Sequence, residues 1–219
     1  MTTKRITKIL EILEKLHAVP TPKLGFETPF QLLIASILSA QCTDTLVNRT
    51  TAHLFKKYSN PEDFARLTPK ELEKEIRSCN YYRTKARHII AACKMLLEQF
   101  HGQVPQDREA LMQLPGVGRK CANVILAFSM GKQAIPVDTH VFRVANRLGL
   151  AKGRDPRRTE ESLMKNLPVE KWIPAHEWLI DHGRRVCKAQ KPRCEICELK
   201  EYCEHYARLQ KRPPPRRGD

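Results

Sequence analysis

The 219-residue chain contains no apolar run close to the roughly 20 residues that a membrane-spanning helix needs, which excludes an integral membrane protein. Residues 1–16 contain neither the apolar block nor the cleavage site of a signal peptide. Glu11 and Glu14 also argue against an import presequence, because such segments are poor in acidic residues. We therefore expect a cytoplasmic protein with no targeting segment and no membrane partner.

The sequence also lacks convincing two-residue alternation between hairpin turns, and it has no internal repeat at solenoid spacing. Apolar residues instead recur every three or four positions, which is typical of helices. Thr28-Pro29 and the capping box from Thr68 to Glu71 mark two helix starts. The sequence predicts an all-α fold, with helices over about 6–16, 30–38, 44–58, 69–76, 86–97, 120–130 and 141–148 and a short helix ending at 111–114.

Acidic residues are outnumbered, with Asp+Glu 24 against Lys+Arg 39, so the formal net charge is +15. Such a balance favours a polyanionic partner, although a solubilising surface would have the same composition. Residues 208–219 contain three consecutive prolines between basic residues. We expect this segment to be a basic, proline-rich mobile tail.

The run from Leu114 to Lys120 lies between two helical patterns and reads LPGVGRK. Gly116 and Gly118, on either side of Val117, allow a tight hairpin whose uncovered amides face the start of the next helix. A nucleic-acid phosphate fits there, and the basic Arg119 that follows favours this interpretation. The alternative is a plain helix–helix connection in which Gly116 is a C-cap.

Lys120 and Asp138 are candidates for a catalytic pair. A neutral lysine amine is a nucleophile, and we expect the helix N-terminus, Arg119 and partial desolvation to favour that form of Lys120. A carboxylate at Asp138 would stabilise positive charge on a sugar as its base departs. The structural alternative for Lys120 is a contact to a phosphate. The alternative for Asp138 is the N-cap of the helix that begins at Thr139, and Asp138 could serve both as this cap and in catalysis.

Eight cysteines in a reducing compartment do not indicate a disulfide framework. Four are scattered through apolar segments, where free thiols are usually small buried hydrophobes: Cys42, Cys79, Cys93 and Cys121. The other four fall within seventeen residues, with six, two and five residues between successive members: Cys187, Cys194, Cys197 and Cys203. This compact, uneven spacing favours an iron–sulfur cluster over zinc, whose ribbons usually carry two separated C-x2-C pairs. Between the first two cysteines, Lys191 and Arg193 would face DNA phosphates.

Together these motifs resemble endonuclease III, a family of helix-hairpin-helix DNA glycosylases with an associated abasic-site lyase activity. The resemblance is carried by the run from Leu114 to Lys120, by Val137-Asp138-Thr139-His140 and by the cysteine spacing. The segment from Ser39 to Asp44 (SAQCTD) is also similar to an early motif of that family. Only the last dozen residues fall outside the resemblance.

The resemblance implies two helical domains on either side of a DNA-binding cleft. Residues 22–135 would form a six-helix bundle that carries the hairpin. Residues 1–21 and 136–207 would form a second domain with one [4Fe-4S] cluster held by the four clustered cysteines. A monomer associated with the nucleoid is the default expectation for such an enzyme.

The resemblance also implies the chemistry. The substrates would be double-stranded DNA with oxidised or ring-saturated pyrimidines, such as thymine glycol and 5-hydroxycytosine, and abasic sites. Lys120 would attack the sugar C1′ with help from Asp138, and the resulting Schiff base would allow β-elimination of the 3′ phosphate. The damaged nucleotide must be flipped out, which costs less for a weakly stacked base.

Several residues would contact the DNA. Gln41 matches the position that enters the gap in the duplex, and Tyr81 lies at a second wedge. Asn80 stands where the family usually has glycine, and Tyr81 is larger than the usual apolar residue, which leaves the opposite-base preference open. The full set of expected contacts is Gln41, Tyr81, Gly116, Val117, Gly118, Arg119, His140, Lys191 and Arg193.

Two other functions fit parts of the pattern. An adenine mismatch glycosylase of the same fold shares the cluster, but it has another residue at the lysine position and an extra C-terminal domain. A non-catalytic helix-hairpin-helix module would use the hairpin only as a phosphate clamp. The eight-oxoguanine branch keeps the lysine but usually lacks these cysteines.

Overall fold

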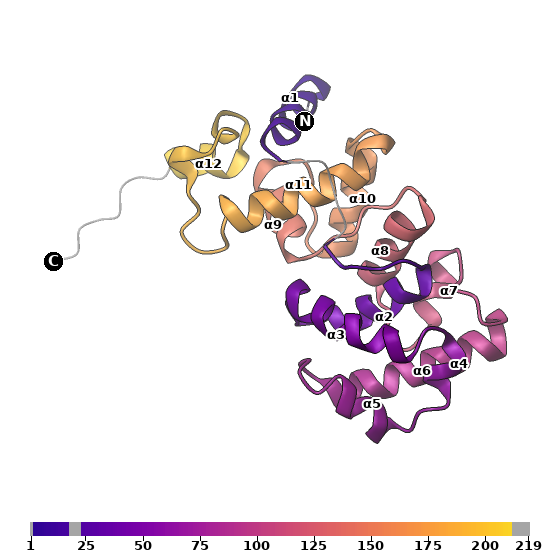
Figure 1. Cartoon of the computed structure of the whole chain (residues 1–219). Coiled ribbons are helices and arrows are strands. Elements are labelled where there is room, and N and C mark those ends of the chain that lie inside the picture. The colour runs from indigo at the N-terminus through magenta and orange to yellow at the C-terminus, as the bar shows by residue number, and fades with distance from the viewer. Residues whose placement is uncertain (1, 18–22, 212–219) are drawn as a thin grey trace. The chain divides into compact units, whose positions relative to one another are not determined.

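The computed structural model describes residues 2–17 and 23–211. Within these ranges the regular secondary structure is entirely helical, which confirms the predicted all-α fold (Figure 1). The chain divides into two compact units, one of residues 22–134 and one that joins residues 1–21 to residues 135–219. Among the described residues, no helix combines the length and the hydrophobicity of a membrane span.

The unit of residues 22–134 contains seven helices in its described part. They are α2 (Pro29–Ser39), α3 (Asp44–Lys57), α4 (Pro61–Ala65), α5 (Pro69–Glu75), α6 (Tyr82–Phe100), α7 (Arg108–Gln113) and α8 (Arg119–Met130). The sequence predicts six of these and misses α4. A helix of five residues is too short to show an apolar period, so its start at Asn60-Pro61 was the only available signal.

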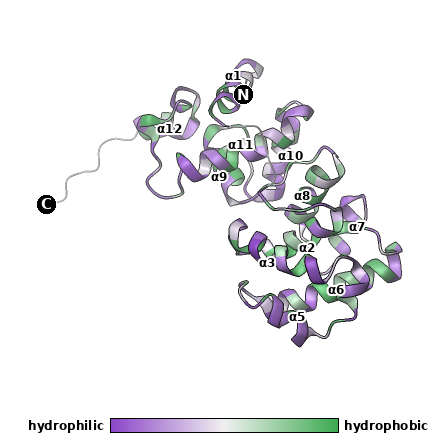
Figure 2. Ribbon diagram, viewed as in Figure 1, coloured by the Kyte–Doolittle hydropathy of each residue, from purple (hydrophilic) through white to green (hydrophobic). Residues whose placement is uncertain are grey.

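Helix α2 lies in the middle of this unit and contacts α3, α6 and α8. Its residues from Leu32 to Leu38 are all buried, because the helix is apolar on nearly every side. The other helices show the alternating hydrophobic and hydrophilic residues of amphipathic helices (Figure 2). Both predicted helix starts are confirmed, since Thr28 caps α2 and Thr68 forms a capping box with Glu71 at α5.

The described part of the other unit contains α1 (Thr3–Leu16), α9 (Thr139–Leu148), α10 (Pro156–Asn166), α11 (Trp172–Arg185) and α12 (Glu204–Gln210), with three short 3-10 turns. Helices α1 and α9 both pack against α11. Ile9 and Leu13 of α1, Val144 of α9 and Leu179 of α11 share one buried core. The first helix of the chain is therefore part of the same core as the last third of the sequence.

Arg5 binds α1 to distant segments of this unit. Its guanidinium donates to the carbonyls of Leu148, at 3.1 Å, and Tyr202, and it forms an ion pair with Glu204 at 3.2 Å. Helix α12 extends through residues 208–210, so the helical part reaches three residues into the predicted tail. Residues 212–219 of that tail lie outside the described residues.

Candidate functional site

The hairpin turn, residues 114–118, connects α7 to α8 as predicted. Gly116 has a φ of +83°, in the left-handed region that glycine adopts without steric cost. A Cβ added there would lie only 3.1 Å from Cβ of His88 and 3.2 Å from Cγ2 of Ile37. Both the backbone conformation and the close packing against α6 and α2 therefore require glycine at this position.

Gly118 has a different role from Gly116. Its φ of −92° is open to any residue, and a Cβ added there would meet nothing within 4 Å. It is the N-cap of α8 and supplies no side-chain hydrogen bond to the amides of the first turn. No side chain of the N-cap therefore covers the positive end of the α8 dipole, and a helix start of this kind can bind a phosphate group.

Lys120 follows as the second residue of α8, within its first turn. Its side chain is exposed, so the expected partial desolvation is not found within this unit. The cause is its place at the helix start, where the side chain points away from the core formed by Ala122 and Val124–Ala127. Next to it, burial raises the pKa of the Cys121 thiol to about 11.

Gln41 and Tyr81 lie on two loops of the same unit, after α2 and before α6. Both side chains are exposed, and both backbones are left-handed, with φ of 55° and 57°. The side chain of Asn80 connects the loops, because its Nδ2 donates to the carbonyl of Gln41 at 2.6 Å. The two loops that carry the expected DNA contacts are thus joined to each other by a hydrogen bond.

Asp138 belongs to the other unit, where it is the N-cap of α9. Its Oδ1 accepts the amide of Val141 at 2.8 Å, so the structural alternative considered for this residue is confirmed. The carboxylate is half-buried. The chain just before it is fixed by His176, whose Nδ1–H donates to the carbonyl of Pro136 at 2.8 Å. In the first turn of α9, Nδ1 of His140 accepts a hydrogen bond from Arg143 at 3.1 Å.

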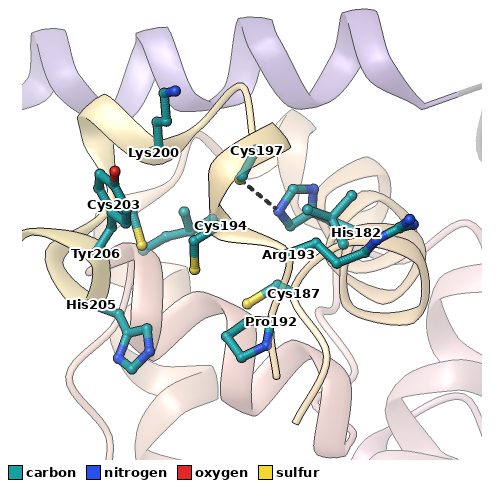
Figure 3. A pocket seen from close by; sticks show the side chains of 12 residues that line it. His182, Cys187, Pro192, Arg193, Cys194, Cys197, Lys200, Cys203, His205 and Tyr206 are labelled. Carbon is teal, nitrogen blue, oxygen red and sulfur yellow. Dashed lines mark hydrogen bonds between the residues drawn. The ribbon is translucent and has the colours of Figure 1, made fainter. Parts of the chain in front are cut away.

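The four clustered cysteines line one hollow of about 330 Å³, part of which is open solvent. Figure 3 shows the sulfur atoms of Cys187, Cys194 and Cys203 turned toward this space. The sulfur of Cys197 lies 3.6 Å from Nε2 of His182. Among the described residues no three potential ligands converge as they do around a single metal ion.

The chemistry of these thiols suits a metal centre. Burial, and secondarily the neighbouring thiols, raise the pKa of Cys194 and that of Cys197, the latter to about 11. Burial also raises the pKa of Cys203. Four soft sulfur donors so close together suit a strongly positive metal centre, which would stabilise them as thiolates.

The segment between the first two cysteines, residues 188–193, is here called the cluster loop. Lys191 and Arg193 on it are exposed. Arg147 of α9 anchors the loop by donating to the carbonyls of Lys188, at 2.7 Å, and Ala189, at 2.9 Å. It also donates to Sγ of Cys187 at 3.5 Å. Sequence reasoning missed Arg147, whose only signal is a basic residue in the last turn of α9.

The remaining cysteines fit the predicted role only in part. Cys79 and Cys93 are buried, as expected of small hydrophobes, and burial raises the pKa of Cys93 to about 12. Cys42 and Cys121 are only half-buried. Cys42 lies at the end of α2, where its sulfur accepts the amide of Asn80 at 3.3 Å.

Comparison with known proteins agrees with this arrangement. Residues 34–169 match the family model of the HhH-GPD superfamily base excision DNA repair protein. Residues 187–203, which begin and end at clustered cysteines, match the iron–sulfur binding domain of endonuclease III. The endonuclease III of Rickettsia conorii is 48% identical over 210 residues, covering 95% of this chain and 100% of that protein. The chain belongs to the endonuclease III family.

Other relatives support the same assignment. The endonuclease III of Escherichia coli is 46% identical, over 90% of this chain and 95% of its own. A solved structure of a trapped endonuclease III–DNA covalent intermediate aligns with a TM-score of 0.90 at 44% identity, over 96% of this chain and 100% of the other. As a member of the endonuclease III family, this protein is a base-excision repair DNA glycosylase with AP lyase activity, and it carries a [4Fe-4S] cluster.

Proposed function

We propose that this enzyme binds double-stranded DNA, removes oxidised and ring-saturated pyrimidines, and cleaves the resulting abasic strand through Lys120. The observation that carries the proposal is the exposed amine at the second position of α8, directly after an uncapped helix start. A phosphate bound at that helix start would hold the DNA backbone within reach of the amine. A phosphate clamp alone would not need a nucleophile at this position.

In the proposed reaction the neutral amine of Lys120 attacks C1′ of a flipped-out nucleotide. The C1′–N bond breaks, and the base leaves with the electron pair and takes up a proton. Opening of the sugar ring gives an imine between the lysine and C1′. Loss of a C2′ proton then expels the 3′ phosphate by β-elimination, and water hydrolyses the imine to release the lysine. Bound DNA would supply the desolvation that the free protein lacks at Lys120.

We assign to Asp138 the stabilisation of positive charge on the sugar as the base departs. Its hydrogen bond to the amide of Val141 fixes the carboxylate at the start of α9, so that little reorganisation is needed during the reaction. The hydrogen bond from His176 to Pro136 restrains the approach to the same residue.

Cys187, Cys194, Cys197 and Cys203 would hold the [4Fe-4S] cluster. The cluster would supply a fixed anchor for the cluster loop, so that Lys191 and Arg193 meet DNA phosphates in a set position. Gln41, Tyr81, His140 and the hairpin turn, with Val117 and Arg119, would make the remaining contacts. We propose a monomer that works in the cytoplasm on the nucleoid.

Borohydride reduction during incubation with an abasic duplex tests the lysine assignment. We expect the wild type and the control variant Lys94→Ala, which alters an exposed lysine of the same unit, to form covalent complexes. Lys120→Ala should form none while its duplex affinity changes by no more than about threefold. Normal trapping by Lys120→Ala would show that another amine is the nucleophile.

A panel of duplexes with single lesions tests the substrate class. Release of thymine glycol and 5-hydroxycytosine, with no release of adenine opposite 8-oxoguanine, is the expected result. The reverse pattern would favour an adenine mismatch glycosylase. Failure to release any base or to cleave an abasic strand would leave only a DNA-binding module.

A further inference from the structure

Asn80 lies between the two loops that carry Gln41 and Tyr81. Its Nδ2 donates to the carbonyl of Gln41 at 2.6 Å, and its own amide donates to Sγ of Cys42 at 3.3 Å. The residue directly precedes Tyr81 in the chain, so a single residue links both loop tips. Asn80 itself is exposed, and it contributes nothing to the buried core.

Both loop tips have a backbone conformation that needs support. Gln41 and Tyr81 are left-handed, with φ of 55° and 57°, which costs a non-glycine residue free energy unless the surroundings fix it. The two side chains are also exposed, and Tyr81 is 64% accessible, so neither is held by core packing. Hydrogen bonds of the neighbouring backbone must therefore define where these side chains project.

Lys85 of α6 holds the chain that leads into the Gln41 loop. Its side chain is buried, and its Nζ donates to the carbonyls of Leu38 and Ala40, both at 2.7 Å. It also lies 3.3 Å from Sγ of Cys42. Lys85 fixes the base of the Gln41 loop to α6, but it does not reach the tips, where Asn80 makes the connection.

We propose that Asn80 is a positioning residue that couples Gln41 to Tyr81, so that the two side chains enter the duplex together. The inference rests on the proposed function, in which both side chains contact DNA. The coupling depends on the donor that the asparagine side chain supplies to the Gln41 carbonyl. Glycine has no side chain to do so, and aspartate would direct a negative charge at the carbonyl oxygen.

Rigid coupling has a consequence for opposite-base recognition. When the flipped nucleotide leaves the stack, Gln41 can hydrogen-bond to the unpaired base and the Tyr81 ring can stack beside it. With the tips bonded, the position of one side chain fixes that of the other. The entropic cost of ordering the two loop tips would then fall on folding of the free enzyme rather than on base flipping.

A double-mutant cycle with and without Asn80 tests this coupling. Gln41→Ala, Tyr81→Ala and the double variant are compared for affinity toward an abasic duplex with 2-aminopurine opposite the lesion. The fluorescence of 2-aminopurine reports unstacking of the opposite base. We expect the two substitutions to be non-additive by about threefold or more when Asn80 is present. In the background of Asn80→Asp, the isosteric variant that lacks the donor, the effects should become additive.

Single substitutions give a second readout. Asn80→Asp and Asn80→Ala should weaken abasic-duplex affinity by about 3- to 10-fold, as expected for one lost hydrogen bond, and should slow the fluorescence change. Their unfolding temperatures should fall by no more than about 4 °C, because the side chain is exposed and lies outside the buried core. The control Asn166→Ala removes a similar bond, from Nδ2 to the carbonyl of Leu150 at 2.9 Å, and should leave the coupling intact.

Two outcomes overturn the inference. Coupling that is absent in the wild type, or that persists unchanged in Asn80→Asp, means that Asn80 does not join the two side chains. Borohydride trapping of the wild type separates this failure from that of the proposed function. Normal trapping with unchanged coupling overturns the role of Asn80 alone, whereas loss of trapping in the wild type overturns both.

Discussion

Asp138 accepts the amide of Val141 through one carboxylate oxygen, at 2.8 Å, and thereby begins α9. The residue that we assign to charge stabilisation is thus also a structural cap. Because asparagine caps helices as well as aspartate does, the two tasks can be separated by mutation.

Asp138→Asn should keep the stability of the wild type and lose the negative charge. We expect base release to slow by about 100-fold, because a fixed charge near the developing cation is lost. Asp138→Ala should slow base release by the same factor. It should also lower the free energy of unfolding by about 1 kcal/mol, because the helix cap is lost as well. Single-turnover kinetics and urea unfolding measure the two effects. Unchanged turnover in Asp138→Asn would remove this residue from the mechanism.

Alanine substitutions at the two glycines of the hairpin turn should have different effects on stability and on DNA binding. Gly116→Ala should destabilise the protein by about 1–3 kcal/mol, because alanine at positive φ is strained and its Cβ meets His88. Gly118→Ala should cost about 1 kcal/mol or less, since its Cβ enters open space. A methyl group at this N-cap would crowd a phosphate bound at the helix start, so duplex affinity should fall in Gly118→Ala without a matching loss of stability. Equal affinity in the wild type and Gly118→Ala would argue against a phosphate at this helix start.

The sequence predicted those features of the fold that depend on residues close together in the chain. Caps such as Thr28 and Thr68, the apolar spacing of α2 and the glycine hairpin all depend on neighbouring residues, and the structure confirms them. Helix α4 was too short for its period to show. Arg147 and Asn80 were not predicted as anchors, because their acceptors lie 41 and 39 positions away in the chain. The exposure of Lys120 also depends on tertiary packing rather than on spacing.

Reversing the charges of the cluster loop should change the salt dependence of DNA binding. The double variant Lys191→Glu, Arg193→Glu should weaken binding to all duplex sequences and reduce the slope of log K against log salt by about 2, one unit per lost phosphate contact. Lys165→Glu, an exposed residue of α10, is the charge-matched control for one substitution. An unaltered slope would mean that the cluster loop faces solvent in the complex.

Arg147→Ala should make the metal centre more labile. The variant loses two hydrogen bonds to the backbone of the cluster loop and one to Sγ of Cys187. We expect its visible iron–sulfur absorption to bleach several-fold faster than that of the wild type in the presence of a chelator, because hydrogen bonds to a ligand and to its loop hold the ligands in place. Arg157→Ala, which removes only an exposed pair with Glu161, is the control. A colourless, zinc-loaded and fully active wild type would contradict the iron–sulfur assignment.

Cys93 and Cys121 should react slowly with iodoacetamide. Burial raises the pKa of Cys121 to about 11 and that of Cys93 to about 12, so both are neutral at pH 8. Only about one in a thousand Cys121 thiols and one in ten thousand Cys93 thiols would then be thiolate. Alkylation measured by mass spectrometry should rise about tenfold per pH unit between pH 8 and 10. Fast, pH-independent modification of Cys121 would mark it as a competing nucleophile beside Lys120.

Because α1 completes a core with α9 and α11, the order of synthesis matters for assembly. Residues 22–134 are contiguous, and they can fold as soon as they leave the ribosome. Helix α1 emerges before them but must wait for residues beyond 135, and the four cysteines come later still. The four-cysteine site can therefore form only after residues 187–203 have emerged, and both ends of the sequence belong to the same compact unit.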